Sequence, residues 1–193
     1  MLYLIIFIAT EGVLSAEGES NDDLCPAWGS MACANDLKGD LLYLDDNTPL
    51  EENKEIFERK CENTMPYIKC VLDFGASHCP NISENIHYEG FKYEYATYSR
   101  ICDKNDEINK WYVENAKCLN TQMVEIYKKC EKTPKIRGLR ELTKEICQID
   151  KRRIECNFEE VGKKCGKEAL LLMKEIMSSY TKVIEKSCSK FDF

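Results

Sequence analysis

The cysteines are the residues of this chain whose type and spacing most clearly carry chemistry. The 193 residues include 12 cysteines. Four of them follow one pattern: Cys, eight residues, Cys, eight residues, Cys, twenty-two residues, Cys. This pattern recurs at an offset of 86 residues, which indicates one structural unit used twice. The two sets are Cys61, Cys70, Cys79, Cys102 and Cys147, Cys156, Cys165, Cys188.

Spacing and compartment decide between metal binding and disulfide formation for these thiols. Zinc sites use closely spaced pairs of the C-x2-C kind, whereas the nearest cysteines here, Cys25 and Cys33, are eight apart. An even number of cysteines in an exported chain favours disulfides. We therefore expect six disulfides, no metal site and no cofactor.

The first residues of the chain predict export. Residues 1–16 read MLYLIIFIATEGVLSA, an apolar run followed by small residues that suit cleavage after Ser15 or Ala16. The run is too short to cross a bilayer, and no later apolar run reaches about 18 residues. We expect a signal peptide at 1–16 and a secreted, extracellular protein without a transmembrane anchor.

The remaining candidates for catalysis are few. The histidines, His78 and His87, are nine apart and stand in no metal-binding or triad-like spacing. Ser77 precedes His78, but the G-x-S-x-G frame of a serine hydrolase is absent. If all the cysteines pair, no thiol remains as a nucleophile. We find no catalytic residues and expect that the protein is not an enzyme.

Charge is unevenly distributed along the chain, whose net charge is -7. Residues 17–58 carry twelve acids against two bases, whereas 128–153 carry ten bases against four acids. The basic stretch is a candidate binding surface for an extracellular protein, a glycan or an anionic surface. A solvated helix face is the more ordinary explanation, and a contact with the acidic stretch, within the molecule or in a dimer, is a third. Nucleic acid is not expected, because the protein is acidic and exported. The ten bases are Lys128, Lys129, Lys132, Lys135, Arg137, Arg140, Lys144, Lys151, Arg152 and Arg153.

Apolar residues recur at spacings of three and four along most of the chain, and no segment alternates as a strand does. The predicted fold is all-α, with two tandem disulfide-stapled three-helix units at 17–103 and 104–193 as the first and second six-cysteine helical repeats. Thr48 and Pro49 predict a helix start, Pro66 predicts a kink or break, and Gly166 predicts a helix end. The predicted helices lie at about 25–44, 49–75, 84–102, 106–130, 138–164 and 167–187.

Helix geometry suggests how the cysteines pair. In an antiparallel hairpin, residues equally far from the turn lie level, at about 1.5 Å of rise per residue. Cys147 and Cys188 lie nineteen and twenty-two residues from Gly166, so they should meet. The same reasoning applies to the first and second predicted helices of each unit. Two further pairs join these helices, one nested inside the other, and both pairs have nearly the same midpoint in the sequence. The predicted bridges are Cys25–Cys79, Cys33–Cys70, Cys61–Cys102, Cys118–Cys165, Cys130–Cys156 and Cys147–Cys188.

A second pairing stays open on the sequence. If Cys33 aligns with Cys118 instead, Cys25 and Cys130 remain as an extra pair that bridges the two units. The sequence also contains one N-x-S/T acceptor, at Asn81, in a predicted loop, which predicts glycosylation there.

The opening Cys25-Pro26-Ala27-Trp28, the Phe57 to Cys61 approach and the Cys61, Cys70, Cys79-Pro80 run before Cys102 together resemble a known family. It is a secreted, cysteine-rich all-α family of unknown function found in spiders and nematodes. The resemblance covers most of the chain after the signal and implies an extracellular protein of venom gland or body fluid, with no catalytic residues to carry over.

The sequence thus supports two hypotheses for function. The first is a secreted disulfide-rich helical protein that binds an extracellular target, with a venom toxin as its sharpest version. The alternative is an extracellular carrier that holds a small apolar ligand between helices, near Tyr95, Tyr98, Ile176 and Tyr180.

Overall fold

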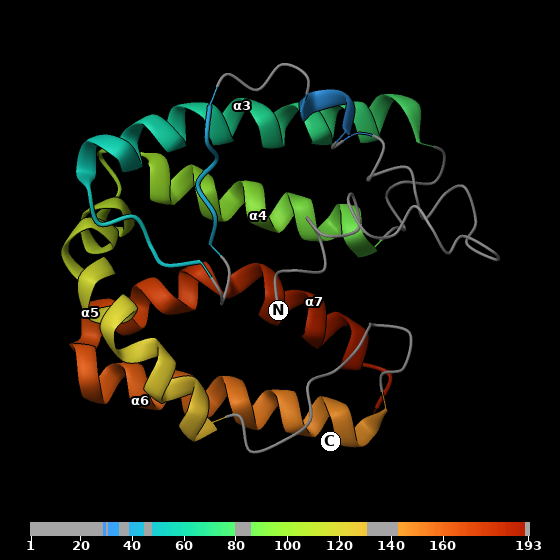
Figure 1. The fold of residues 1–193 in the computed structure, drawn as a ribbon. Coiled ribbons are helices and arrows are strands. Elements are labelled where there is room, and N and C mark those ends of the chain that lie inside the picture. Colours follow the sequence, from blue (N-terminus) through green and yellow to red (C-terminus); the bar gives the residue numbers. More distant parts are fainter. Residues whose placement is uncertain are drawn as a thin grey trace. The chain divides into compact units, whose positions relative to one another are not determined.

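The computed structural model describes residues 29, 31–34, 39–44, 48–79, 86–130 and 143–191. These ranges contain helices and no strand, so the predicted all-α class is confirmed. The chain divides into two compact units, 1–102 and 103–193, called here the first and second units. The long helices are α3 (Lys54–His78), α4 (Ile86–Cys102), α5 (Glu107–Cys130), α6 (Lys144–Ile176) and α7 (Ser178–Cys188) (Figure 1).

Helix α3 begins later than the sequence predicts. Its N-cap is Asn53, whose side-chain oxygen accepts hydrogen bonds from the backbone N–H groups of Glu55 at 3.0 Å and Ile56 at 3.1 Å. The Glu51 carboxylate accepts from the backbone N–H of Asn53 at 3.0 Å. The predicted start at Thr48 is therefore wrong, because Asn53 satisfies the free N–H groups of the first turn instead.

Pro66 does not break α3, so the break that the sequence allowed there, as the alternative to a kink, does not occur. The helix runs unbroken from Lys54 to His78 with Pro66 inside it. Phe57 and Cys61 are buried before the proline, and Ile68 and Val71 are buried after it. Burial of this continuous stripe offsets the backbone hydrogen bond that proline cannot make.

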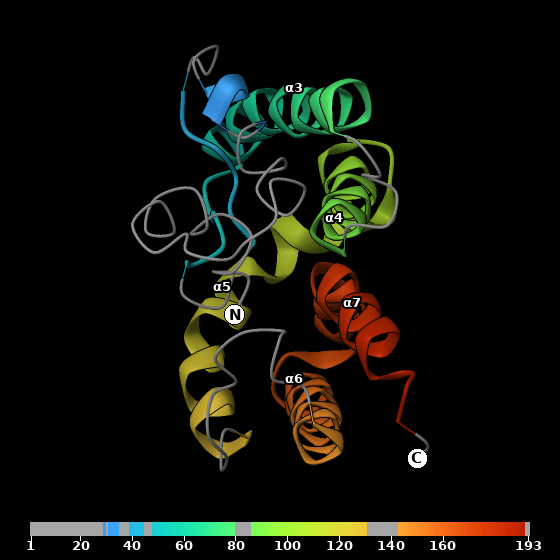
Figure 2. The same cartoon turned by 90° about the vertical axis from the view of Figure 1, so that its right-hand side faces the viewer.

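Helices α3 and α4 pack side by side in opposite directions in the first unit (Figures 1 and 2). Of the predicted first helix, residues 31–34 are helical, whereas 39–44 are not, which corrects the prediction for that end. The backbone of Leu42 bonds to side chains instead. Its N–H donates to Thr64 Oγ1 at 2.7 Å, and its carbonyl accepts from the Tyr98 hydroxyl at 2.9 Å.

In the second unit, α5 packs against α6, and α6 packs against α7. The predicted helix end at Gly166 is confirmed, because Gly166 has φ 90° and ψ -178° and divides α6 into a first arm, 144–165, and a second arm, 167–176. A positive φ strains any residue with a Cβ, so glycine suits this turn. The second arm and α7 run back along the first arm (Figure 1).

The second unit has a fully buried apolar core. Tyr112, Ala116 and Leu119 of α5 and Val161 and Leu172 of α6 are all at most 1% exposed. At the far end of the hairpin, Cys147, Ile184 and Cys188 form a separate buried cluster. Together they hold α6 and α7 in register.

Candidate functional site

Disulfides tie the helices of each unit to one another. The structure contains Cys33–Cys70, Cys61–Cys102, Cys118–Cys165, Cys130–Cys156 and Cys147–Cys188, with Cα–Cα distances from 5.5 to 5.9 Å. Each bridge joins two different helical segments. These are bridges of the nested pairing.

The Cys130–Cys156 bridge excludes the other pairing, in which Cys130 joins Cys25. Cys79 is also disulfide-bonded. Its predicted partner, Cys25, lies outside the described residues, as do the predicted signal peptide and the glycosylation site at Asn81. No free thiol is found among the described cysteines.

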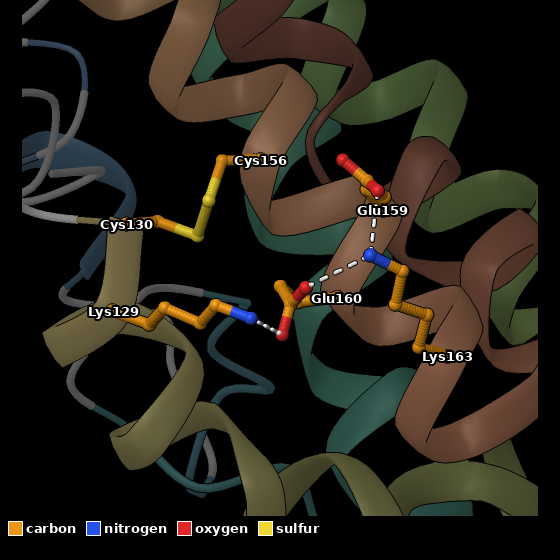
Figure 3. The surroundings of a disulfide bond; sticks show 6 residues. All are labelled: Lys129, Cys130, Cys156, Glu159, Glu160 and Lys163. Atoms are coloured by element: carbon orange, nitrogen blue, oxygen red, sulfur yellow. Dashed lines mark hydrogen bonds and ion pairs between the residues drawn. A yellow bond between two sulfur atoms is a disulfide. The ribbon is translucent and has the colours of Figure 1, made fainter.

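Two bases of the predicted binding surface pair with acids of the second unit. The first is Lys129, whose ammonium lies 2.6 Å from Glu160 Oε2, beside the Cys130–Cys156 bridge (Figure 3). Lys163 also reaches the Glu160 carboxylate, at 3.3 Å. Glu160 is buried, and the hydrogen bond from Lys129 is the main reason that its pKa lies below the usual value.

The second of these bases is Arg153. Its guanidinium lies 2.8 Å from Oδ1 of Asp150, which is fully buried, and donates to the Tyr180 hydroxyl at 2.7 Å. Burial raises the pKa of Asp150, while the Arg153 charge and the Tyr180 hydroxyl oppose that rise. This cluster joins the first arm of α6 to α7.

The other described bases of the predicted surface are exposed. Lys128 lies at the end of α5, and Lys144, Lys151 and Arg152 lie on the first arm of α6. Lys132, Lys135, Arg137 and Arg140 fall outside the described residues. The structure therefore leaves an exposed basic surface on the second unit from which Arg153 is withdrawn, and on which Lys129 is exposed but already paired with Glu160.

A groove of about 520 Å³ runs between the first arm of α6 and α7. Its walls carry apolar side chains, among them Ile154, Phe158 and Ile184, and it ends near the Cys147–Cys188 bridge. Charged side chains stand along it, namely Lys151, Glu155, Lys174 and Glu185. The spacing of Lys151, Ile154, Glu155 and Phe158 on one helix face was the sequence signal for this groove.

The aromatic residues predicted to hold a ligand do not line this groove. Tyr98 is buried in the first unit and donates its hydroxyl to Leu42, and Ile176 is buried in the second unit. Tyr180 bonds to Arg153. Tyr95 belongs to the first unit and Tyr180 to the second. The contacts of Tyr98 and Tyr180 therefore lie within their own units and hold the helices together.

His78 and Glu94 are two further titratable residues that could take part in chemistry. The His78 ring stacks on Phe74 with centroids 4.6 Å apart, and its Nδ1 lies 3.2 Å from the Phe74 carbonyl. The side chain of His87 lies outside the described part. Glu94 is buried, and burial raises its pKa to about 7.

No group of three or more His, Cys, Asp or Glu side chains in the described ranges is arranged to hold a metal ion. Within the same ranges, no helix combines the length and apolar character needed to cross a membrane.

Comparison with known proteins gives no relative: no family model, curated protein or solved structure matches this chain.

Proposed function

We propose that this chain is a secreted, disulfide-stapled helical protein that acts by binding an extracellular target and not by catalysis. The apolar leader at 1–16 and the even set of cysteines support export into an oxidising compartment. The resemblance to the secreted cysteine-rich family of spiders and nematodes agrees with this proposal. The most specific version of the proposal is that the protein is a venom component.

The observation that carries the proposal is the bridging of helix pairs beneath an exposed basic face. The bridges restrict the motion of α5, α6 and α7, so surface side chains keep their relative positions without a large core. Lys128, Lys144, Lys151 and Arg152 are exposed on these helices. A fixed set of positive charges suits an anionic partner, such as a sulfated glycan or an acidic protein face.

Salt-dependent binding tests this proposal. The oxidised protein is applied to immobilised heparin and to vesicles of anionic lipid, and affinity is measured as salt is raised. Binding should weaken steeply with salt, because exposed charges are screened. The double substitution of Lys144→Gln and Arg152→Gln should weaken binding by roughly 30-fold, at about 1 kcal/mol per charge. Lys117→Gln, an exposed lysine of α5, is the matched control.

The groove of the second unit favours a second candidate, an extracellular carrier of a small apolar ligand. Its volume lies within the range of about 300 to 1,000 Å³ that is typical of ligand pockets. A carrier should release a small molecule on denaturation, and the melting temperature of the emptied protein should rise when that molecule is restored. Denaturation of protein from its native fluid, followed by solvent extraction and mass spectrometry, tests this.

A further inference from the structure

The groove between the first arm of α6 and α7 is amphipathic in its lining. Ile154 and Ile184 present apolar surface, and Phe158 adds an aromatic ring. Lys151 and Lys174 line it with long aliphatic stems that end in ammonium groups. A groove with an apolar wall and charges along its rim suits a ligand that has an apolar body and a polar head.

The shape of the groove favours an elongated ligand. It follows the first arm of α6 from Cys147 to Phe158, which lie eleven positions apart and so about 16 Å apart along the helix axis. The facing wall is formed by α7 and the end of the second arm, from Lys174 to Ser189. A linear hydrocarbon chain can lie along such a path with most of its length against apolar side chains.

The charges near the Cys147–Cys188 end of the groove favour one sign of charge on the ligand's polar head. Residues 144–155 and 181–190, which flank this end, contain seven bases and four acids, a net charge of +3. One of these acids, Asp150, is fully buried and paired with Arg153. The lining of the groove itself balances Lys151 and Lys174 against Glu155 and Glu185. The excess of bases lies in the flanking residues, and this excess favours an anion at that end.

The two lysines of the groove differ in their surroundings. The ammonium of Lys174 lies 5.7 Å from the centre of the Phe158 ring, within cation–π range, away from the Cys147–Cys188 bridge. Lys151 is exposed on the first arm of α6, within the basic end. Lys151 is therefore the better placed of the two to receive an anionic head.

From these features we infer that the groove of the second unit binds a long-chain carboxylate, with its chain along Ile154, Phe158 and Ile184 and its head at Lys151. This inference rests on the carrier form of the proposed function and narrows it to one ligand class. It does not depend on binding to glycans or to anionic membranes.

Displacement of a fluorescent fatty acid measures this binding. The oxidised full chain is loaded with cis-parinaric acid, which is then displaced by palmitate or by hexadecanol, the uncharged alcohol of equal chain length. Palmitate should displace the probe at clearly lower concentration than hexadecanol, because only the carboxylate gains a charged hydrogen bond.

Two substitutions separate the head from the chain. Lys151→Gln should weaken palmitate binding by about tenfold and leave hexadecanol unchanged, because it removes one charge-assisted hydrogen bond. Thr181→Trp places an indole in the groove, which Thr181 lines, and should abolish both. Lys117→Gln is the control, and circular dichroism checks the fold of each variant.

The inference is overturned by equal affinity for palmitate and hexadecanol, by unchanged palmitate binding in Lys151→Gln, or by binding that survives Thr181→Trp in a folded variant. If hexadecanol binds as well as palmitate and Thr181→Trp abolishes that binding, the ligand is not specifically a carboxylate, but the carrier function stands. Absence of binding to either compound, with no small molecule released on denaturation, overturns both. The binding of an anionic partner through the basic surface is a separate proposal, and the heparin experiment tests it independently.

Discussion

The guanidinium of Arg153 donates a hydrogen bond to the Tyr180 hydroxyl over 2.7 Å, and this contact joins the first arm of α6 to α7. The same guanidinium pairs with Asp150, which has no exposed surface. Arg153 is therefore the counter-charge of a buried acid and the link between two helices. An arginine inside a run of bases was expected on the surface, and its role here is structural.

Replacing Arg153 should destabilise the second unit. Arg153→Met leaves the Asp150 carboxylate buried without its counter-charge, which should lower the free energy of unfolding by about 3 kcal/mol. Urea unfolding of the oxidised protein measures this loss. Arg152→Met, one residue earlier and exposed, should change little. Adding Asp150→Asn to Arg153→Met should recover part of the loss, and no recovery would count against the buried pair.

Glu94 should make stability fall as pH rises. The pKa of Glu94 rises from its ordinary value of 4.5 to about 7 in the folded protein, because burial disfavours the carboxylate. Below about pH 4.5 the side chain is protonated in both states and imposes no penalty. Between about pH 4.5 and 7 the unfolded state ionises first, so the penalty grows to about 3 kcal/mol and then stays constant.

The Glu94→Gln variant isolates this effect. The free energy of unfolding of the natural protein, relative to that of the variant, should fall between pH 4.5 and 7.5. Urea titrations at several pH values measure the difference. An unchanged difference across this range would show that Glu94 is ionised and solvated in the folded state.

Glu160 should act in the opposite direction on pH. Hydrogen bonds from Lys129 and Lys163 hold the pKa of Glu160 below its ordinary value of 4.5. The stabilisation is present above the unfolded pKa and is lost as pH falls through the folded one. Glu160→Gln should therefore reduce the loss of stability in acid. Glu159→Gln is a close control, because Glu159 pairs with Lys163 but is exposed and does not meet Lys129 (Figure 3). An equal effect of both substitutions contradicts the special role of Glu160.

The two bridges that close the helix hairpins should contribute about equally to stability. Cys61–Cys102 and Cys147–Cys188 both span 41 residues. Because the unfolded chain gains similar freedom in each case, replacing either pair by serine should cost about 4 kcal/mol. Thermal unfolding and urea unfolding measure each loss. A loss from only one of the two pairs would contradict an equivalent role for the repeats.

The sequence predicted the helices that are long and periodic. Helix α5 was expected at about 106–130 and is found at Glu107–Cys130, because its apolar residues recur regularly and no proline interrupts them. The turn at Gly166 was also predictable, since only glycine suits a positive φ so readily. Cysteine spacing with helix rise was enough to choose the partners of Cys147 and Cys61.

Local signals failed where tertiary packing decided the outcome. Thr48 and Pro49 form a proper start signal, yet Asn53 caps α3. Pro66 is a helix breaker by itself, but burial on both sides of it keeps α3 continuous. Propensity describes one turn at a time, whereas packing acts along the whole helix.

The buried polar groups stand at positions that the repeat aligns, which is a signal in the sequence. The 86-residue offset aligns Asp150 with Thr64 and Tyr180 with Glu94. Asp150, Thr64 and Glu94 are all buried, and Tyr180 is partly buried. A polar residue within an otherwise apolar helical stripe was the signal at Asp150. The side chain that neutralises it is fixed only by three-dimensional contact.

The bridges themselves test the central claim, that covalent ties between neighbouring helices fix this fold. The native protein is digested without reduction, and mass spectrometry identifies the joined peptides. We expect Cys61 joined to Cys102 and Cys147 to Cys188, with Cys33–Cys70, Cys118–Cys165 and Cys130–Cys156 alongside them. A peptide that joins Cys61 to Cys70, or free thiols in the native protein, would contradict it.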